Sequence, residues 1–573
     1  MKNQFVTVSS LDKVFPNEAP RLLQKRYSVF KNEVFHFQAC CYSLEALFDC
    51  KIKIDSPIKE YVSVRIVEPL PAYLAQKRGE GDGYILKKKQ SSTLYPEWLR
   101  EIRPEGENVR KCIWTSFWVT VNRDEKEVLS GTYPIKIQLF SKNEKLFAEC
   151  VFVLTILDQD LPASDLKYTA WIHYDCIAQQ HNVEMFSPEF YAVFNRYLEN
   201  AVRHGMTMLY TPLFTPPLDT AVGGERRTCQ LVSVRRTGEK DYSFDFSALT
   251  FFIENAQKAG IRQFEFSHLA TQWGAYHPPK IVADIGGQEK KIFGWETSLD
   301  SDEYLIFLDR FLAALAVFVE EKGLSDAVSF HISDEPGGNQ LEYFKKFRNV
   351  IVKHFSGAKI MDALCEKIYY TEKVVNVPVV ATDHVQDFIF EPYTERWVYY
   401  CSWQKNKFVS NRFFNMPSQR NRILGIQLYA NNIKGFLHWG FNFYNSVLSK
   451  HSINPYLITD ADGDFESGDC FFVYPKENGV DDSLRQEVFY DGFSDYRALK
   501  LLENLYGRSY VERVLKRNKI SGFTKYKKSA RWHLRFRKKI NNIIIKKVKE
   551  KLVKEGSYAE NRLDKNDRQR KYA

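Results

Sequence analysis

The sequence has no long hydrophobic run, and it holds little proline and glycine. Its longest apolar stretches fall far short of the ~18 residues that a membrane-spanning helix needs. With 21 Pro and 28 Gly among 573 residues, a collagen-like or largely disordered chain is excluded. Hydrophobic residues at 44% and aromatic residues at 15% instead indicate a large globular protein with an extensive core.

The cysteines form no CxxC pair, so they predict neither a zinc site nor a redox motif. The one neighbouring His and Cys couple, His173 and Cys176, has no second pair of ligands beside it. We therefore expect buried free thiols and no metal or other cofactor. The first residues turn polar at Leu11-Asp12-Lys13 and lack the apolar core of a secretory signal, which predicts a cytoplasmic protein.

Positive charge is concentrated at one end of the chain. The net charge is +10, yet residues 507–573 hold 23 Lys and Arg against 6 Asp and Glu, so this tail carries +17 and residues 1–506 carry −7. Apolar residues recur every fourth position over 530–555, which predicts a basic amphipathic helix. Such a helix either docks on the barrel or contacts an anionic membrane surface or acidic polymer, which would place the protein at the inner membrane face; nucleic acid is the least favoured partner.

Residues 1–162 alternate apolar and polar residues in short runs, as at 61–67 and 117–122. Turn-forming stretches such as 122–126 separate these runs. Two runs at 130–140 and 146–156 predict a last hairpin, which Pro162 closes. This pattern is typical of an N-terminal β-sandwich domain.

Residues 163–446 change to short apolar runs that alternate with segments of helical period, which predicts βα units and a parallel sheet. The strands are expected at 168–175, 206–214, 262–267, 328–333, 359–363, 377–382, 396–402 and 435–441, and helices at 187–204, 247–258, 301–322, 339–354 and 418–433. The sixth strand is the weakest because it contains Pro378. This order predicts a (β/α)₈ TIM-type catalytic barrel with its active site at the C-terminal strand ends.

Residues 447–506 predict a closing segment packed on the barrel, with a strand-like run at 470–474 and a helix over 483–506. The tail, 507–573, follows it. On the closing helix we expect Arg485, Glu487 and Asp495 to form salt bridges to the barrel rather than to take part in chemistry.

The strongest chemical signal is the run His331-Ile-Ser-Asp-Glu-Pro at the end of the fourth predicted strand. Its two acids, Asp334 and Glu335, stand at the edge where a barrel enzyme keeps its active site. Like charges this close repel and raise the pKa of one of them, which suits a general acid and is costly in ordinary packing. We therefore expect both acids to be catalytic rather than a cap for the next helix.

Neighbouring acids suit one route of glycoside cleavage better than another. The common retaining glycosidase uses two acids about 5–5.5 Å apart, usually from different strands, one of them a nucleophile. The seventh predicted strand, 396–402, ends without an acid. A consecutive pair instead suits substrate-assisted hydrolysis, in which the 2-acetamido oxygen of the sugar attacks its own anomeric carbon.

The run from His331 to Pro336 resembles the catalytic signature of glycoside hydrolase family 123. Residues 434–442 resemble the eighth-strand pattern of that family, and 468–475 and 483–499 resemble its closing region, also known as domain of unknown function 4091. The resemblance spans about residues 110–505 and leaves out the tail. It implies a β-sandwich and a (β/α)₈ barrel that hydrolyse β-linked N-acetylgalactosamine by the substrate-assisted route.

Carried onto this sequence, the resemblance implies that Asp334 orients the acetamido group and is ionised near neutrality. Glu335 is then the general acid and later the base, and it is protonated near neutrality. Aromatic and polar residues near the strand ends are the candidates for sugar binding. They are Trp439, Trp403, Tyr400, Trp273, Tyr276, Asn442, Tyr444, His268 and Asp383.

The predicted activity is therefore hydrolysis of a β-linked N-acetylhexosamine in an oligosaccharide or glycopolymer, without a metal. Two alternatives stay open. One is a glycosidase of other sugar specificity on the same scaffold, and the other is a non-catalytic protein that binds a glycan or glycopolymer.

Overall fold

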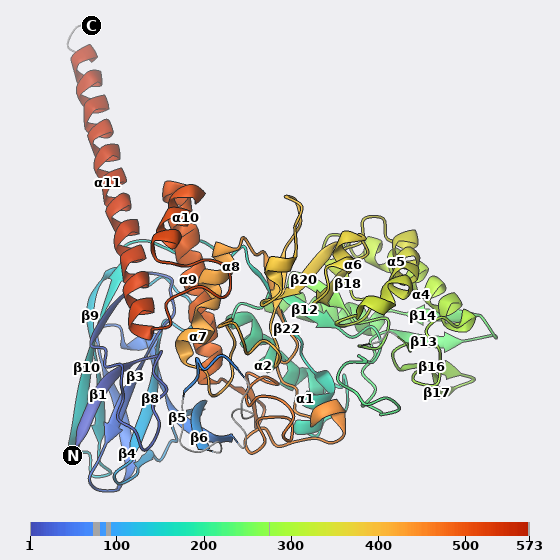
Figure 1. Ribbon diagram of the computed structural model, residues 1–573. Helices are drawn as coiled ribbons and strands as arrows, with labels where there is room; N and C mark the ends of the chain where they lie inside the picture. Colours follow the sequence, from blue (N-terminus) through green and yellow to red (C-terminus); the bar gives the residue numbers. More distant parts are fainter. Residues whose placement is uncertain (1, 73–80, 87–92, 274–275, 571–573) are drawn as a thin grey trace.

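The computed structural model describes residues 2–72, 81–86, 93–273 and 276–570, with side chains up to Lys551 and at Val553. Figure 1 shows a strand-rich N-terminal region on one side of the molecule and a mixed region of helices and strands on the other. The long helix α9 (Leu484–Tyr506) lies between them. The molecule is thus multidomain, with a sheet-rich N-terminal part.

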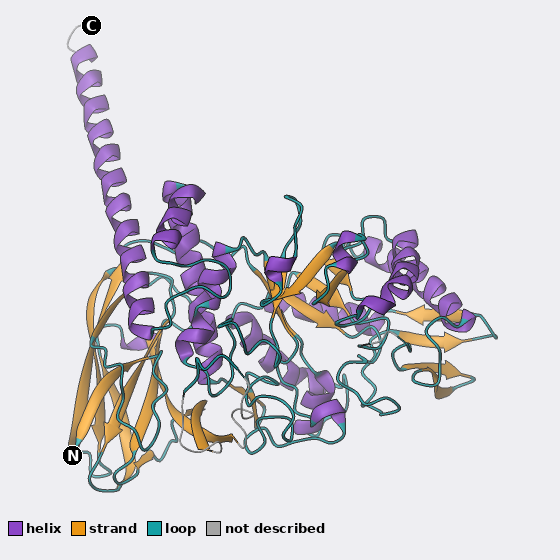
Figure 2. Ribbon diagram, in the orientation of Figure 1, coloured by secondary structure: helices purple, strands orange, loops and turns teal. Residues whose placement is uncertain are grey.

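The N-terminal region consists of two five-stranded sheets, ordered β1-β3-β8-β5-β6 and β2-β10-β9-β4-β7 (Figure 2). Their strands are β1 (Gln4–Ser9), β2 (Arg26–Phe30), β3 (Phe35–Tyr42), β4 (Leu47–Asp55), β5 (Val62–Ala72), β6 (Thr93–Glu101), β7 (Glu107–Val109), β8 (Trp114–Val121), β9 (Gly131–Phe140) and β10 (Leu146–Leu157). The pairing of β9 with β10 is antiparallel, which confirms the last predicted hairpin. Phe37 of β3 stacks on Phe152 of β10 at a ring-centroid distance of 4.4 Å, so apolar residues of both sheets share one core.

All eight strands expected in the second region are present, most of them shorter than predicted. They are β11 (Lys167–Ala170), β12 (Met208–Thr211), β15 (Gln263–Phe266), β18 (Val328–Phe330), β19 (Met361–Leu364), β20 (Val377–Ala381), β21 (Trp397–Tyr399) and β22 (Gly435–His438). They pair in parallel in two sheets, β11-β22-β21-β20-β19 and β12-β15-β18. An isolated parallel bridge from Phe330 to Ile360 links the sheets on one side, and the Thr207 N–H donates to the Tyr168 carbonyl, 3.0 Å, on the other. A fully closed barrel remains a prediction.

Helices follow most of these strands. They are α1 (Tyr174–Gln180), α2 (Pro188–Arg203), α3 (Ser247–Ala259), α4 (Asp302–Glu321), α5 (Leu341–His354), α6 (Ile368–Thr371), α7 (Ser418–Arg422) and α8 (Leu424–Ala430). The single helix expected over 418–433 is thus divided at Ile423. The long loops carry a further sheet that the sequence did not predict, formed by β13 (Ser233–Arg236), β14 (Tyr242–Asp245), β16 (Ile281–Ile285) and β17 (Gln288–Phe293).

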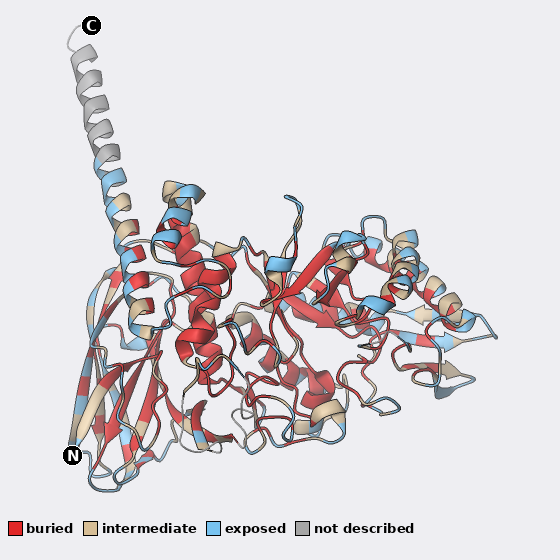
Figure 3. Cartoon of the chain, viewed as in Figure 1, coloured by how far each residue is buried: buried red, intermediate tan, exposed pale blue. Residues whose placement is uncertain are grey.

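The closing region differs from its prediction in one respect. The run 470–474 is not a strand. Only its last residue, Tyr474, belongs to a strand, in a hairpin whose strands β23 (Tyr474–Lys476) and β24 (Gly479–Asp481) are joined by a turn of two residues. The predicted helix is α9, which begins after the Ser483 cap and is buried along most of its length (Figure 3). It crosses α8 closely, because a Cβ at Gly425 would lie 1.7 Å from the Gly492 carbonyl oxygen.

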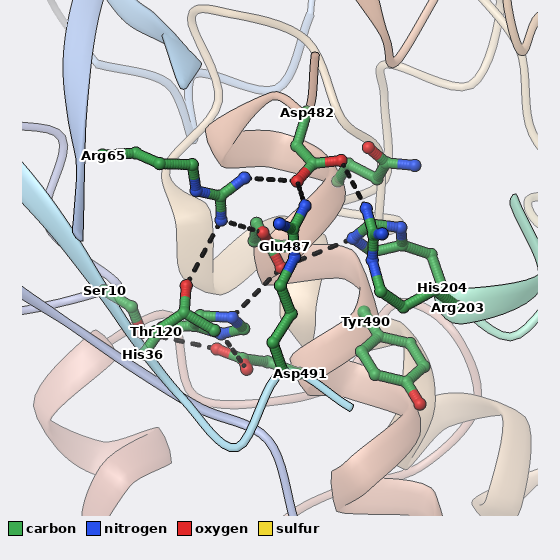
Figure 4. A network of polar contacts seen from close by, with 12 residues as sticks. Ser10, His36, Arg65, Thr120, Arg203, His204, Asp482, Glu487, Tyr490 and Asp491 are labelled. Carbon is green, nitrogen blue, oxygen red and sulfur yellow. Dashed lines mark hydrogen bonds and ion pairs between the residues drawn. The ribbon is translucent and has the colours of Figure 1, made fainter. Parts of the chain in front are cut away.

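A buried charge network, which we call the α9 junction, joins α9 to the N-terminal sheets (Figure 4). Arg65 of β5 pairs with Asp482 and Glu487. His36 of β3 lies between two carboxylates, with its Nε2 3.0 Å from Glu487 and its Nδ1 2.8 Å from Asp491. Burial lowers the pKa of His36, but Asp491 and Glu487 outweigh it and raise the pKa to about 9. The histidine is therefore a cation in this network.

The salt bridges expected on α9 are present, with a wider set of partners than the barrel. Arg485 pairs with Glu97 of β6 at 2.7 Å, and Glu487 pairs with Arg65. Asp495 is 2.8 Å from Arg422 of α7 and 2.6 Å from His533. This helix therefore ties together the sandwich, the catalytic region and the tail.

The basic tail contains α10 (Arg508–Arg517) and α11 (Ala530–Arg570). The first turns of α11 pack against α9 and β2 and bury Phe536, Ile540 and Ile544. The predicted amphipathic helix is confirmed, and it docks on α9, on β2 of the sandwich and on α7 of the predicted barrel region. Its predicted apolar residue Leu552 lies outside the described side chains.

Within the described ranges, no helix contains an apolar stretch of the length that membrane crossing requires.

Candidate active site

Strand β18 places the two neighbouring acids at its C-terminal end. Its three residues are buried, and the chain stays buried through Ser333 before Asp334 and Glu335 reach partial exposure. Glu335 has a φ of +46°, a left-handed backbone conformation that is uncommon outside glycine. Such conformations persist where the surrounding structure holds them, and they concentrate at functional sites.

Asp334 and Glu335 line the same cavity. The cavity lies at the C-terminal ends of the parallel strands, because Ala363, Tyr399 and Leu437 at the ends of β19, β21 and β22 also line it. The remaining lining residues are Trp171, Leu218, Asp219, Gln272, Trp273, Cys401, Ser402, Trp403, Trp439 and Phe465. The predicted acids thus open into a pocket whose walls are largely aromatic.

Glu335 is held by two aromatic side chains. The Tyr399 hydroxyl donates a hydrogen bond to Glu335 Oε1, 2.5 Å. Burial raises the pKa of Glu335 above its usual range, while hydrogen bonding from Tyr399 and Trp273 opposes part of the rise. A raised pKa favours the protonated form of Glu335, which is the form that a general acid needs.

Asp334 is the more strongly perturbed acid. Burial raises its pKa well above the usual range, and the neighbouring carboxylates of Glu335, Asp362 and Asp219 add to the rise. A raised pKa favours the protonated form of Asp334 in the free cavity, so its ionisation near neutrality stays a prediction. A ligand that donates an N–H to this carboxylate would favour its ionised form again.

A layer of buried charge lies beneath the two acids. His331 donates from Nε2 to Glu265 Oε1 at 2.7 Å and from Nδ1 to Asp362 Oδ1 at 3.2 Å. Burial lowers the pKa of His331, but Asp362 and Glu265 outweigh it and raise the pKa to about 9. The resulting imidazolium holds both acidic side chains in place. Asp362 in turn accepts the Ile332 N–H at 3.3 Å, just before Asp334 and Glu335.

The same layer contains the side chains nearest to a metal-binding arrangement. Ligand atoms of His268, His331 and Asp362 lie within 4.8 Å of one another. His331 already uses both ring nitrogens in hydrogen bonds, and His268 Nδ1 is 2.8 Å from the Tyr210 hydroxyl. We therefore interpret the cluster as a hydrogen-bond network that positions β18.

Three of the nine predicted sugar-binding residues line the cavity: Trp273, Trp403 and Trp439. Trp439 is fixed by a hydrogen bond from its Nε1 to Asp469 Oδ2, 3.0 Å. Trp403 is 74% exposed, so its ring stands at the mouth of the cavity. Exposed aromatic faces of this kind suit stacking against the apolar face of a sugar ring.

The other six do not line the cavity, which corrects their predicted placement. Tyr400 is buried against Phe436 and His438, because alternation along the strand turns it away from the side of Tyr399. The remaining five have other partners: Tyr276 packs on Tyr343, Asn442 bonds the His173 backbone, the Tyr444 hydroxyl donates to Val473, His268 stacks on His331, and Asp383 contacts His384 and Gln404.

Sequence reasoning missed several cavity residues. Tyr399 is next to the predicted Tyr400, and the strand pattern gave no reason to prefer it. Asp219 and Gln272 lie in the loops after β12 and β15, where no motif marks them. Their position shortly after predicted strands was the one available signal.

Two sequence comparisons bear on this site. A family model described as "Glycoside hydrolase 123, catalytic domain" matches residues 171–502, more than half of the chain and including both acids. No curated protein matches the sequence.

Solved structures give one strong likeness. A family 123 glycoside hydrolase from Clostridium perfringens, described in work on glycolipid glycan hydrolysis, aligns with a TM-score of 0.75 and 14% identity over 97% of this chain and 100% of that chain. A family 5 mannosidase from Rhizomucor miehei aligns with a TM-score of 0.31 and 11% identity over 58% of this chain and 92% of that one. A β-glucuronidase from Parabacteroides merdae has a TM-score of 0.31 and 10% identity over 81% and 51%. The first of these shows the fold, and the other two scores are too low to support an argument.

Proposed function

The chain belongs to glycoside hydrolase family 123, and we propose that it cleaves β-linked N-acetylhexosamine, with N-acetylgalactosamine as the preferred sugar, by substrate-assisted catalysis. One observation carries the proposal: two consecutive acids line one cavity, and burial raises the pKa of both. No second acid from another strand is needed for this route.

In the first step, the carbonyl oxygen of the 2-acetamido group attacks C1 of the sugar. The bond from C1 to the leaving oxygen breaks, and protonated Glu335 gives its proton to that oxygen. Asp334 accepts a hydrogen bond from the acetamido N–H, which orients the carbonyl and stabilises the positive charge that develops on the oxazolinium ring.

In the second step, water attacks C1 from the face that the aglycone has left. Glu335, now a carboxylate, accepts a proton from this water, and the C1–O bond of the oxazolinium breaks to restore the acetamide. The two inversions give retention of configuration at C1. The hydrogen bond from Tyr399 to Glu335 Oε1 orients the carboxyl group for these proton transfers.

The architecture we propose around this site is a β-sandwich over 1–162, a closed (β/α)₈ barrel over 163–446, a closing segment over 447–506 and the tail over 507–573. The link between Phe330 and Ile360 and the hydrogen bond from Thr207 to Tyr168 support closure of the barrel, because they fall at the two gaps between its sheets.

The basic tail suggests that the protein binds its substrate at a lipid surface. The Clostridium perfringens relative is described in work on glycolipid glycan hydrolysis, and we propose a glycolipid glycan here as well. Support comes from the exposed cations of α11, which face solvent while its apolar side is docked: Arg531, Arg535, Lys538, Lys539, Lys546 and Lys549. These charges would attract an anionic lipid surface.

Co-sedimentation with lipid vesicles tests this role of the tail. We expect the protein to bind phosphatidylserine-containing vesicles at low salt and to lose binding when Lys538, Lys539 and Lys546 are changed to Glu. Equal binding to neutral and anionic vesicles would contradict it.

Turnover of aryl glycosides tests the proposed activity. The wild type should hydrolyse an aryl β-N-acetylgalactosaminide, and Glu335→Gln should lower kcat/KM by about 10³-fold because the general acid is lost. A thiazoline derived from N-acetylgalactosamine should inhibit tightly, because it mimics the oxazoline intermediate. Turnover of a different glycoside without thiazoline inhibition would favour another glycosidase, and glycan binding that survives loss of both acids would favour a binding protein.

A further inference from the structure

The loop after β12 brings a third acid, Asp219, into the same cavity as the catalytic pair. Its backbone is fixed at both ends: Arg226 NH1 donates to the Leu218 carbonyl at 3.0 Å, and the Ser449 hydroxyl donates to the Asp219 carbonyl at 2.8 Å. Asp219 itself has a left-handed φ of +48°. The side chain is therefore held in place by a strained but well-anchored backbone.

The carboxylate of Asp219 is buried and lacks partners. The residue is 6% exposed, and neither carboxylate oxygen has a hydrogen-bond partner of normal geometry among the described residues. The nearby cation does not serve it, because Arg226 donates to both oxygens of Asp175, at 2.8 Å and 2.6 Å. A buried acceptor of this kind is costly unless a ligand or water supplies the missing hydrogen bonds.

Gln272 provides the complementary donor. The Asp219 N–H bonds its side-chain oxygen Oε1, which fixes the orientation of the amide because only the oxygen can accept. Its Nε2 is buried and has no partner among the described residues, and Gln272 also lines the cavity. The hydrogen bond from the Asp219 N–H to Gln272 Oε1 therefore holds two residues together at the wall of the pocket. One of them carries an unpartnered acceptor, and the other carries an unpartnered donor.

We propose that Asp219 and Gln272 determine sugar specificity by binding two hydroxyl groups of the sugar whose glycosidic bond is cleaved. Asp219 accepts from the hydroxyls and Gln272 donates to one of them. This inference rests on the proposed function, since it names how the same cavity recognises its sugar. Asp334 engages the acetamido group at C2, so the hydroxyls in question are those at C3, C4 and C6.

Electrostatics support the assignment. Burial raises the pKa of Asp219 to about 6, although Arg226 lowers it and the Leu448 N–H lies near enough to favour the ionised form. The exposed acid Asp464 adds to the rise. Hydroxyl donors from a sugar would replace the solvation that burial has removed, and bonds to a charged acceptor discriminate more strongly than bonds between neutral groups.

Deoxygenated substrates separate recognition from structural support. We would measure kcat/KM for aryl β-N-acetylgalactosaminide and its 3-, 4- and 6-deoxy forms with the wild type, Asp219→Ala and Gln272→Ala. Removing a recognised hydroxyl should lower kcat/KM of the wild type roughly 10- to 100-fold. Asp219→Ala should lose a similar factor on the parent sugar and then show almost no further loss on the matching deoxy sugar. Asp460→Asn, which alters a buried acid outside the cavity lining, should behave as the wild type.

Equal losses for Asp219→Ala on the parent and on every deoxy sugar would overturn the inference and leave the proposed function intact. If the wild type turns over no N-acetylgalactosaminide, calorimetry with free N-acetylgalactosamine and its deoxy forms gives the second readout. Binding that depends on Asp219 and on the same hydroxyls would then support the inference while the proposed function fails. Absence of sugar binding would overturn both.

Discussion

Two groups of buried carboxylates in this molecule have opposite electrostatics. At the α9 junction and the base of the tail, burial raises the pKa of Asp482, Glu487 and Asp495, but cationic partners outweigh it and hold each pKa below the usual range. In the cavity, burial raises the pKa of Asp334 and Glu335, and the opposing effects of His331 on Asp334 and of Tyr399 and Trp273 on Glu335 do not outweigh it. Burial is common to both groups, and the presence of an arginine or charged histidine in contact is what differs.

The difference separates structural acids from chemical ones. Asp482, Glu487 and Asp495 pair with arginine or histidine side chains and so join parts of the fold. Their lowered pKa values leave them no proton to exchange near neutrality. Asp334 and Glu335 in the cavity have raised pKa values, which cost stability when the two acids are ionised. Three measurements of the free energy of unfolding test this contrast, in order of expected effect.

The largest effect should follow removal of Arg65. Arg65→Met leaves Asp482 and Glu487 buried with less compensation, and we expect a loss of about 3–5 kcal/mol in the free energy of unfolding by chemical denaturation. Arg123→Met is the matched control, because Arg123 contacts the same Asp482 at 2.6 Å from a side chain that is 36% exposed. It should cost less than about 1 kcal/mol. Equal losses would show that burial of the pair does not decide its contribution.

A smaller, pH-dependent effect should arise from His36. Its pKa is raised from 6.5 to about 9 on folding, so its contribution is complete below pH 6.5 and is lost as pH rises through about 9. The contribution should be roughly 2–3 kcal/mol. We expect the difference in unfolding free energy between the wild type and His36→Gln to shrink from pH 6 to pH 9.5, and taking this difference removes the parallel titration of His331. A constant difference would contradict a charged His36.

The smallest effect should have the opposite sign. Asp334→Asn removes an acid whose raised pKa costs stability as pH rises above the normal carboxyl range, so the variant should be more stable than the wild type by about 1–2 kcal/mol at pH 7. The gain should disappear below about pH 4, where the acid is protonated in both states. Thermal or chemical unfolding at the two pH values measures it, and a destabilised variant at pH 7 would place Asp334 with the paired acids.

The positions of the strands and of the two cavity acids, Asp334 and Glu335, could be predicted from the sequence. Which face of each strand points inward could not. The sequence places Asp334 and Glu335 at the end of a strand, because the alternation of apolar and polar residues stops where these two acids begin. At the end of β21, in contrast, Tyr399 and the next residue, Tyr400, are both aromatic and both almost fully buried, at 4% and 0% exposure. Parallel strands covered on both faces lose the polar alternation that would tell one face from the other.

Long-range partners were the other limit of the sequence. The salt bridges of Arg485, Glu487 and Asp495 were expected, but their partners Glu97, Arg65 and His533 are distant in sequence and no local pattern names them. The division between α7 and α8 likewise depends on packing, because Gly425 meets Gly492 of α9 there. Asp219 is a similar case, because its proposed role rests on carboxylate oxygens without a hydrogen-bond partner among the described residues, and no sequence pattern shows this.

The most direct test is a series of aryl β-N-acetylgalactosaminides whose acetyl group carries zero, one, two or three fluorine atoms. Fluorine withdraws electrons from the acetamido oxygen, so a mechanism in which that oxygen attacks C1 predicts a stepwise fall in kcat/KM along the series. A flat series, or equal turnover of the matching 2-hydroxy sugar, would contradict catalysis by the substrate's own acetamido group with Asp334 and Glu335 as its partners.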